Sequence, residues 1–157
     1  MKTIFRDFSS DELMNLAISE ARNCLKHDDV PVGAILLNQK LEIVGRGHNK
    51  RELRQLASSH AEIVAIDSAC KKLGTWNLAG CTLVVTLEPC PMCAGAIVNS
   101  RISKVIFGCH DPKAGSLGSL YNFSSDPRLN HNFIVESGVL ATECSNLLTS
   151  FFSEKRR

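Results

Sequence analysis

The sequence lacks the long apolar segments that would place a chain in a membrane. Its longest aliphatic stretches, such as residues 34–37, fall far short of the roughly 20 residues that a membrane-spanning helix needs. Residues 1–8 contain no apolar core of the kind that defines a signal peptide. We therefore expect a cytoplasmic protein that does not associate with membranes.

A large excess of charge of one sign is also missing. The chain carries 18 Lys and Arg against 16 Asp and Glu, so its formal net charge is +2. A charge this small does not by itself indicate a nucleic-acid-binding protein, although it leaves local basic patches open. The 44% hydrophobic and 22% charged residues are typical of a globular domain, which excludes the disordered and fibrous classes.

A disulfide framework is not expected, although cysteine is plentiful. The seven cysteines are an odd number, spread from Cys24 to Cys144. Without a secretory signal, they are better interpreted as reduced thiols and metal ligands. Five of them lie on apolar faces or beside strands and are predicted to be packing residues: Cys24, Cys70, Cys81, Cys109 and Cys144.

The 157 residues fit one domain, which we expect to span residues 1–157. Hydrophobic periodicity predicts helices after Ser9, from His60 to Gly74, from Pro91 to Arg101 and at the carboxyl end. Apolar runs predict five strands, at residues 32–37, 41–45, 81–87, 104–109 and 133–136, the first two forming a hairpin. This alternation indicates an α/β fold: a three-layer α/β/α domain around a mixed five-stranded sheet.

Four residues in two short segments carry the chemistry. His60 and Glu62 lie in His-Ala-Glu, and Cys90 and Cys93 lie in Pro-Cys-Pro-Met-Cys. Cysteines three apart share a face of a first helical turn, where the helix N-terminus favours their thiolate forms. One imidazole and two thiolates suit Zn²⁺, and three protein ligands leave the open position of a catalytic zinc site. The segments therefore predict that His60, Cys90 and Cys93 bind zinc.

Glu62 is the candidate proton carrier of this site. Zinc lowers the pKa of bound water from about 15.7 toward 7, and a nearby carboxylate can take that proton and pass it on. Taken singly, each residue has a simpler interpretation. Glu62 could form a capping box with Ser59, His60 could be a structural histidine, and the cysteine pair could be redox-active or half of a four-cysteine site. Their joint occurrence favours the zinc site.

His-Ala-Glu followed by Pro-Cys-x-x-Cys resembles the signature of the zinc-dependent nucleobase deaminases. Within that superfamily, the chain is most similar to the bacterial tRNA-specific adenosine deaminases. The similarity extends from Asp11 to Phe152. Its specific segments are residues 30–34, 47–49, 60–63, 85–96, 107–108, 111–113, 115–117, 129–131 and 151–152.

The resemblance implies a cytidine deaminase-like fold and one Zn²⁺ per subunit. It also implies a homodimer that converts adenosine to inosine at the wobble position of a tRNA anticodon loop, with an arginine tRNA of anticodon ACG as the expected substrate. Carried over by position, Asn49 should hydrogen-bond the purine, and the Ala61 backbone should face its reacting edge. Five further residues should line the cleft for the splayed loop: Asp111, Lys113, Asn130, Phe151 and Phe152.

Aromatic and basic side chains admit both a functional and a structural interpretation. One of Phe151 and Phe152 is expected to pack in the core, and the other to contact RNA. Several basic residues could contact phosphates or belong to an ordinary solvated surface: Lys50, Arg51, Arg54, Arg101, Lys104 and residues 155–157.

Three other functions compete with tRNA deamination. A guanine or cytosine-compound deaminase acting on a free base or nucleotide would share the zinc core, but Asn49 and the Asp111-x-Lys113 segment argue against it. A silent RNA-binding subunit would be expected to lack Glu62. A structural zinc module would need a fourth protein ligand.

Overall fold

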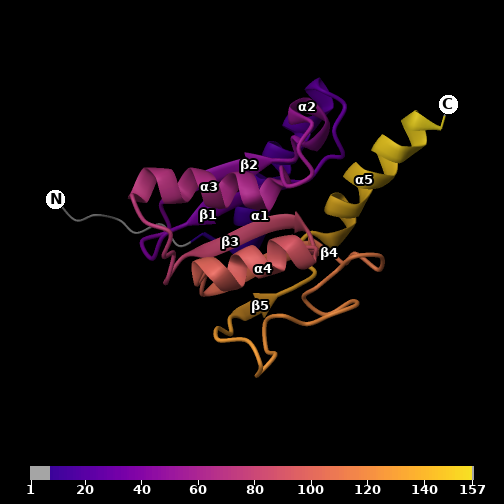
Figure 1. Ribbon diagram of the computed structural model, residues 1–157. Helices are drawn as coiled ribbons and strands as arrows, with labels where there is room; N and C mark the ends of the chain where they lie inside the picture. The colour runs from indigo at the N-terminus through magenta and orange to yellow at the C-terminus, as the bar shows by residue number, and fades with distance from the viewer. Residues whose placement is uncertain (1–7, 157) are drawn as a thin grey trace.

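A five-stranded sheet lies between two layers of helices in the computed structural model, which describes residues 8–156 (Figure 1). The strands are β1 (Gly33–Leu37), β2 (Ile43–His48), β3 (Thr82–Leu87), β4 (Lys104–Cys109) and β5 (Ile134–Glu136). The helices are α1 (Ser10–Arg22), α2 (Arg51–Arg54), α3 (Ala61–Leu73), α4 (Pro91–Ser100) and α5 (Ala141–Lys155), and the 3₁₀ turn η1 (Asn23–Lys26) follows α1. The predicted three-layer α/β/α fold is confirmed.

The sheet is mixed, as predicted. Its strand order is β2-β1-β3-β4-β5, with β1 antiparallel to both neighbours and β3, β4 and β5 parallel to one another. The predicted hairpin is present, but its second strand begins at Ile43 and continues to His48. Because β3 and β4 are parallel, their carboxyl ends meet at the same edge of the sheet.

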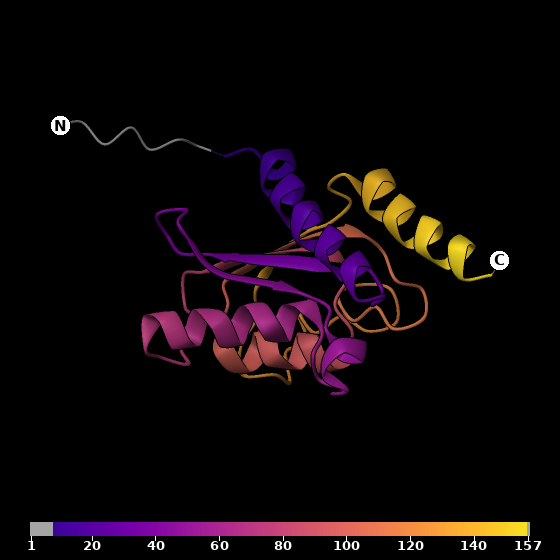
Figure 2. The same ribbon diagram turned by 90° about the horizontal axis from the view of Figure 1, so that it is seen from above.

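Alternating side chains on the strands build two separate cores. On β1, Ala34 and Leu36 face a core shared with α3 and α4, while Ile35 and Leu37 face a core shared with α1 and α5. Figure 2 shows the result from above, with α1 and α5 on one side of the sheet and α3 and α4 on the other. Helices cover both faces, which explains why the central strands are apolar on both sides.

The ends of the helices follow local signals in the sequence. The Ser9 side chain accepts a hydrogen bond from the Glu12 N–H at 3.1 Å, which confirms the cap before α1. Helix α3 ends at Gly74, whose φ of 69° lies in the left-handed region that favours glycine. At Gly47 of β2, a side chain would overlap the Ala61 carbonyl oxygen, so glycine allows the start of α3 to approach the sheet.

Two short elements of the structure, α2 and the turn η1, are absent from the sequence-based expectations, because four-residue helices leave little periodicity to detect. Helix α3 is buried on one face only, and its opposite face exposes Asp67 and Lys71. The terminal helix α5 buries Cys144 and Phe151 but leaves Phe152 45% exposed.

Within residues 8–156, the structure contains no helix long and apolar enough to cross a membrane.

Candidate metal centre and substrate pocket

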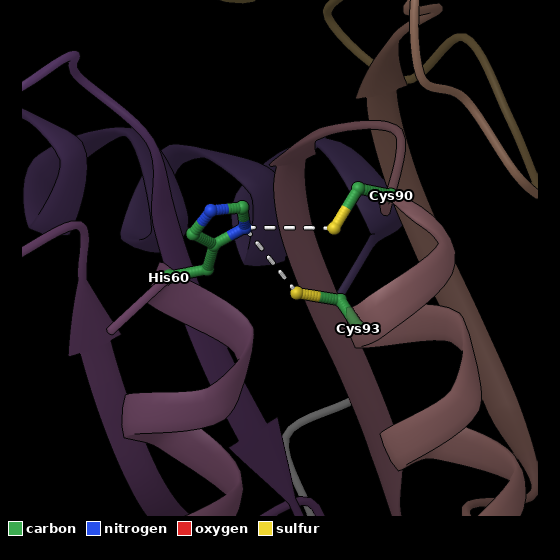
Figure 3. A group of neighbouring side chains, drawn as sticks. All are labelled: His60, Cys90 and Cys93. Carbon is green, nitrogen blue, oxygen red and sulfur yellow. Dashed lines mark hydrogen bonds between the residues drawn. The ribbon is translucent and has the colours of Figure 1, made fainter. Parts of the chain in front are cut away.

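The starts of α3 and α4 bring the three predicted ligands together. His60 is the residue before α3, Cys90 is the residue before α4, and Cys93 lies in the first turn of α4. The His60 Nδ1 atom lies 3.6 Å from the Sγ atom of each cysteine. In Figure 3 both thiols point toward the imidazole, although the histidine comes from a different helix. Residues 30 positions apart therefore share one site.

The spacing of these donor atoms fits a zinc ion. With bonds of about 2.05 Å to nitrogen and 2.3 Å to sulfur, tetrahedral zinc would separate the two donors by about 3.6 Å. Within residues 8–156, His60, Cys90 and Cys93 form a group that could hold a metal ion, and their donor atoms lie within 4.8 Å of one another. Glu62 is not part of this group. A site with one nitrogen and two sulfur donors favours Zn²⁺ over Mg²⁺ or Ca²⁺.

The two thiols have unlike surroundings. A hydrogen bond from the Cys93 thiol, together with one from His60, lowers the pKa of Cys90 to about 4. That same bond and burial raise the pKa of Cys93. Cys90 also lies at the N-terminus of α4, where the helix dipole favours a thiolate. The hydrogen bond to the Cys90 thiolate raises the pKa of His60. Of the two cysteines, Cys90 is therefore the one whose surroundings favour the thiolate form that binds a cation.

Glu62 lies in the first turn of α3 and is 4% exposed. Burial raises the pKa of its carboxyl group to about 7. The capping box with Ser59 does not form, because His60 is the cap residue of α3 and no side chain caps this end. A carboxyl group with a pKa near neutrality can both accept and release a proton at physiological pH.

A pocket opens beside these residues. It is lined by Val30, Val32, Asn49, Arg51, His60, Ala61, Glu62, Leu87, Glu88, Cys90, Asp111 and Ala114. The structure therefore brings the predicted substrate residues Asn49, Ala61 and Asp111 together with the metal ligands. The Asn49 amide is held in place, since its Nδ2 donates to the Val30 carbonyl and its Oδ1 accepts from the Arg51 N–H, each at 3.1 Å.

Four predicted substrate residues do not line this pocket. Lys113 is exposed two positions after Asp111, and its N–H donates to the Asp111 carboxylate at 3.0 Å. Asn130 is exposed on the long segment between β4 and β5. Phe151 is 8% exposed, and its ring meets the 45%-exposed Phe152 edge to face, with centroids 5.3 Å apart. Phe151 is thus the member of the pair that packs.

The candidate basic residues separate into two groups. Arg51 and Arg54 lie on α2, and Arg51 lines the pocket. Arg101 and Lys104 lie at the opposite end of the sheet, because Arg101 precedes β4 and Lys104 is its first residue, whereas the predicted ligands Cys90 and Cys93 follow the parallel strand β3. Lys104 also pairs with Glu136 at 3.4 Å. Of the basic tail, residue 157 lies outside the described residues.

Two buried carboxylates near the pocket were missed by the sequence analysis. Asp29 and Glu88 are both fully buried at their side chains. Burial opposes ionisation of Glu88, but hydrogen bonds from the Ser119 hydroxyl and from backbone N–H groups outweigh it and lower its pKa. The same balance lowers the pKa of Asp29. In the sequence, the signal for these two buried carboxylates is weak, since each is marked only as an acidic residue directly beside an apolar strand or segment.

Comparison with known proteins agrees with this site. The family model of the MafB19-like deaminases matches residues 8–156. A tRNA-specific adenosine deaminase of Bacillus subtilis (strain 168) is 52% identical over 150 residues, which cover 95% of this chain and 92% of that protein. A tRNA-specific adenosine deaminase of Haemophilus influenzae is 41% identical over 146 residues, covering 93% and 84% of the two chains.

A solved structure shows the same relationship in three dimensions. It comes from work on A-to-I editing by tRNA:A34 deaminases at the wobble position of transfer RNA. Its TM-score is 0.83 at 40% identity, and the match covers 87% of this chain and 98% of that one. Sequence, family model and structure therefore agree, and this chain belongs to the family of tRNA-specific adenosine deaminases.

Proposed function

We propose that this protein is a zinc-dependent hydrolase that converts adenosine to inosine at the wobble position of a tRNA anticodon. One observation carries the proposal: His60, Cys90 and Cys93 form a cluster that could hold a metal ion, and the adjoining pocket also contains the buried Glu62. The names of the related proteins support the choice of tRNA as the substrate.

The proposed chemistry is a hydrolysis, in which water replaces the amino group on carbon 6 of adenine and ammonia leaves. Bound zinc would supply an activated water at neutral pH. Glu62 accepts one proton of the water and delivers it to ring nitrogen 1. It then accepts the second proton from the new hydroxyl group on carbon 6 and passes it to the amino group, which leaves as ammonia. Its pKa of about 7 suits both directions of transfer.

Asn49 and Ala61 are proposed to orient the purine. The Asn49 amide keeps one N–H and one oxygen lone pair available after its two hydrogen bonds to the backbone. Because those bonds hold the amide in place, it loses little entropy when a base binds. The Ala61 backbone lies between the ligand His60 and the proton carrier Glu62, where it would face the reacting edge of the ring.

The rest of the anticodon loop is proposed to lie on the surface around the pocket, against Asp111, Lys113, Asn130, Phe151 and Phe152. Of the two phenylalanines, the exposed Phe152 is the candidate for stacking on a base, and Phe151 supports it from below. A single-stranded loop lowers the cost of moving the adenine out of its stack, which a pocket reaction requires.

The decisive experiment uses zinc-loaded protein and an unmodified arginine tRNA of anticodon ACG. Reverse transcription and sequencing should show the wobble adenosine read as guanosine. Glu62→Ala is the matched variant, which we expect to keep its zinc and lose activity. A Glu62→Ala variant that keeps both zinc and full activity would refute the role of Glu62.

Free guanine, cytidine and adenosine serve as the competing substrates in the same assay. A solved guanine deaminase from Nitrosomonas europaea has this fold, with a TM-score of 0.77 at 22% identity, so fold alone does not choose the substrate. Ammonia released from guanine or cytidine, with no change in tRNA, would keep the zinc mechanism and overturn the RNA assignment.

We also propose that residues 1–157 form one domain and that the protein is a cytoplasmic homodimer. Strands from both halves of the chain share one sheet, which supports the single domain. Exposed apolar side chains on and beside α2 and α4, including Leu53, Leu56 and Met92, support a partner surface. Light scattering coupled to size-exclusion chromatography should give a mass near twice 17.2 kDa. A single species near that monomer mass would contradict the dimer.

A further inference from the structure

Two segments that line the pocket lie outside α3 and α4, the helices that place the predicted metal ligands. The first, here called the α2 segment, comprises residues 49–54 and contributes Asn49 and Arg51 to the pocket. The second, called the loop segment, comprises residues 110–119 and contributes Asp111 and Ala114. Each segment closes around one buried carboxylate.

The loop segment is wrapped around Glu88. The Oε1 atom accepts hydrogen bonds from the Asp111 N–H at 3.0 Å and from the Ser119 hydroxyl at 2.5 Å. The Oε2 atom accepts from the N–H groups of Leu117 and Ser119, both at 3.0 Å. A side chain at Gly115 would overlap the Glu88 carboxylate, so the chain passes directly over it. Four donors from one segment thus end on one side chain.

The α2 segment depends on Asp29 in the same way. The Asp29 Oδ1 atom accepts from the Glu52 N–H at 2.7 Å, and its Oδ2 atom accepts from the Leu53 N–H at 3.1 Å. The His27 Nδ1 lies 2.7 Å from the same Oδ2. A helix of four residues has no stability of its own, so α2 depends on bonds from the rest of the protein, and those to Asp29 hold two of its four residues.

These contacts leave Glu88 and Asp29 little capacity to act on a substrate. An ionised carboxylate offers about four lone-pair sites, and Glu88 uses four for its own chain. We propose that Glu88 and Asp29 are positioning residues, which hold the loop segment and the α2 segment in the arrangement that receives the RNA. They act through Asp111, Asn49 and Arg51. The inference rests on the proposed function.

The test compares the full-length, zinc-loaded protein with Glu88→Gln and Asp29→Asn. Each substitution keeps the shape of the side chain but replaces one carboxylate oxygen with an NH₂ group, which cannot accept a hydrogen bond from a backbone N–H. We expect the KM for the arginine tRNA to rise by about tenfold or more, the range for a lost charge-assisted hydrogen bond, while kcat changes less than about threefold. Zinc content should stay at wild-type level. Glu136→Gln, which alters a carboxylate bound to Ser10 and Lys104, is the matched control and should leave KM unchanged.

Hydrogen–deuterium exchange gives a readout independent of activity. Glu88→Gln should increase exchange in residues 110–119 only, and Asp29→Asn in residues 49–54 only. If Glu88→Gln fails to fold, Ser119→Ala removes one of the four donors and should give a smaller change in the same direction.

Two outcomes would overturn the inference: wild-type exchange in both segments with unchanged KM, or lost kcat with unchanged KM and full zinc. A wild-type protein that leaves tRNA unchanged would instead refute the proposed function, and the exchange data would still report whether the carboxylates hold the segments.

Discussion

The metal side of the pocket, formed by the starts of α3 and α4, rests on the sheet, whereas the substrate side rests on single side chains. Both α3 and α4 share a core with the strands, and they place the His60 Nδ1 atom 3.6 Å from the Sγ atoms of Cys90 and Cys93. The α2 segment and the loop segment instead depend on hydrogen bonds to Asp29 and Glu88. The difference indicates that the loss of one buried carboxylate should disturb the arrangement of the substrate side, whereas the backbone of the metal side is held by many packing contacts.

Removal of one predicted metal ligand should abolish zinc binding and activity without disturbing the substrate side of the pocket. In Cys93→Ala, we expect zinc affinity to fall by more than the roughly 10- to 100-fold that the loss of an outer-shell partner costs, and tRNA deamination to fall to background. Metal analysis and the sequencing assay measure the two effects. Hydrogen exchange in residues 110–119 should stay unchanged. A variant with one zinc per chain and normal activity would show that Cys93 is not a ligand.

Alanine substitutions of the two neighbouring phenylalanines should have different effects, one on stability and the other on RNA binding. Phe151→Ala empties a buried position and should lower the free energy of unfolding by about 3 kcal/mol, measured by urea denaturation. Phe152→Ala should leave stability nearly unchanged but weaken tRNA binding by about 1–3 kcal/mol, as for a lost base-stacking contact. Each variant is the control for the other. Equal effects of both variants on tRNA affinity would contradict the assignment.

Acidification should weaken the substrate side through His48, which precedes Asn49. Burial, with Lys50 and His27 nearby, lowers the pKa of His48 to about 4, and its Nε2 lies 3.1 Å from that of His27. The folded state thus favours neutral His48, which contributes full stability above the unfolded pKa of about 6.5 and loses it as the pH falls toward 4. The loss should reach about 2–3 kcal/mol.

Chemical denaturation between pH 7 and pH 4 would measure this loss, with His48→Asn as the comparison. Any loss of bound zinc on acidification would affect both proteins alike, so the difference between their two slopes isolates His48. Parallel pH profiles for the two proteins would show that this histidine does not couple stability to pH.

Loss of the α1 cap should have the smallest effect and touch neither side of the pocket. Ser9→Ala removes the acceptor for the Glu12 N–H and should lower stability by about 1 kcal/mol, measured by thermal denaturation. The KM and kcat for tRNA should match the wild type, because α1 does not line the pocket. A change in KM would show that the helices on that face influence the substrate side.

The parts of this protein that were predictable depend on short-range patterns. Ser9, Gly74 and Pro91 mark helix ends within one or two residues, and the apolar runs mark all five strands. Cys90 and Cys93 are three positions apart, so one helical turn already brings their sulfur atoms together. Their pairing with His60 required only that two helices start at the same edge of the sheet.

The unpredicted parts depend on long-range contacts. Asp29 resembles a solvated residue at a helix end, but it is fully buried and holds α2 from more than 20 positions away. Glu88 similarly accepts a hydrogen bond from Asp111, 23 positions later in the chain. Carboxylates of this kind look alike in a sequence whether they face water or a set of N–H groups, because only the donors around them differ.

Short-range patterns in the sequence were enough to predict the alternation of strands and helices, and to name His60, Glu62 and the Cys90–Cys93 pair as candidates for metal binding and proton transfer. The tertiary structure alone decided which phenylalanine is buried, which basic residues lie near the pocket and which carboxylates hold its substrate side. The physical reason is that burial and hydrogen bonding are properties of a residue's final neighbours, and those neighbours come from distant parts of the chain.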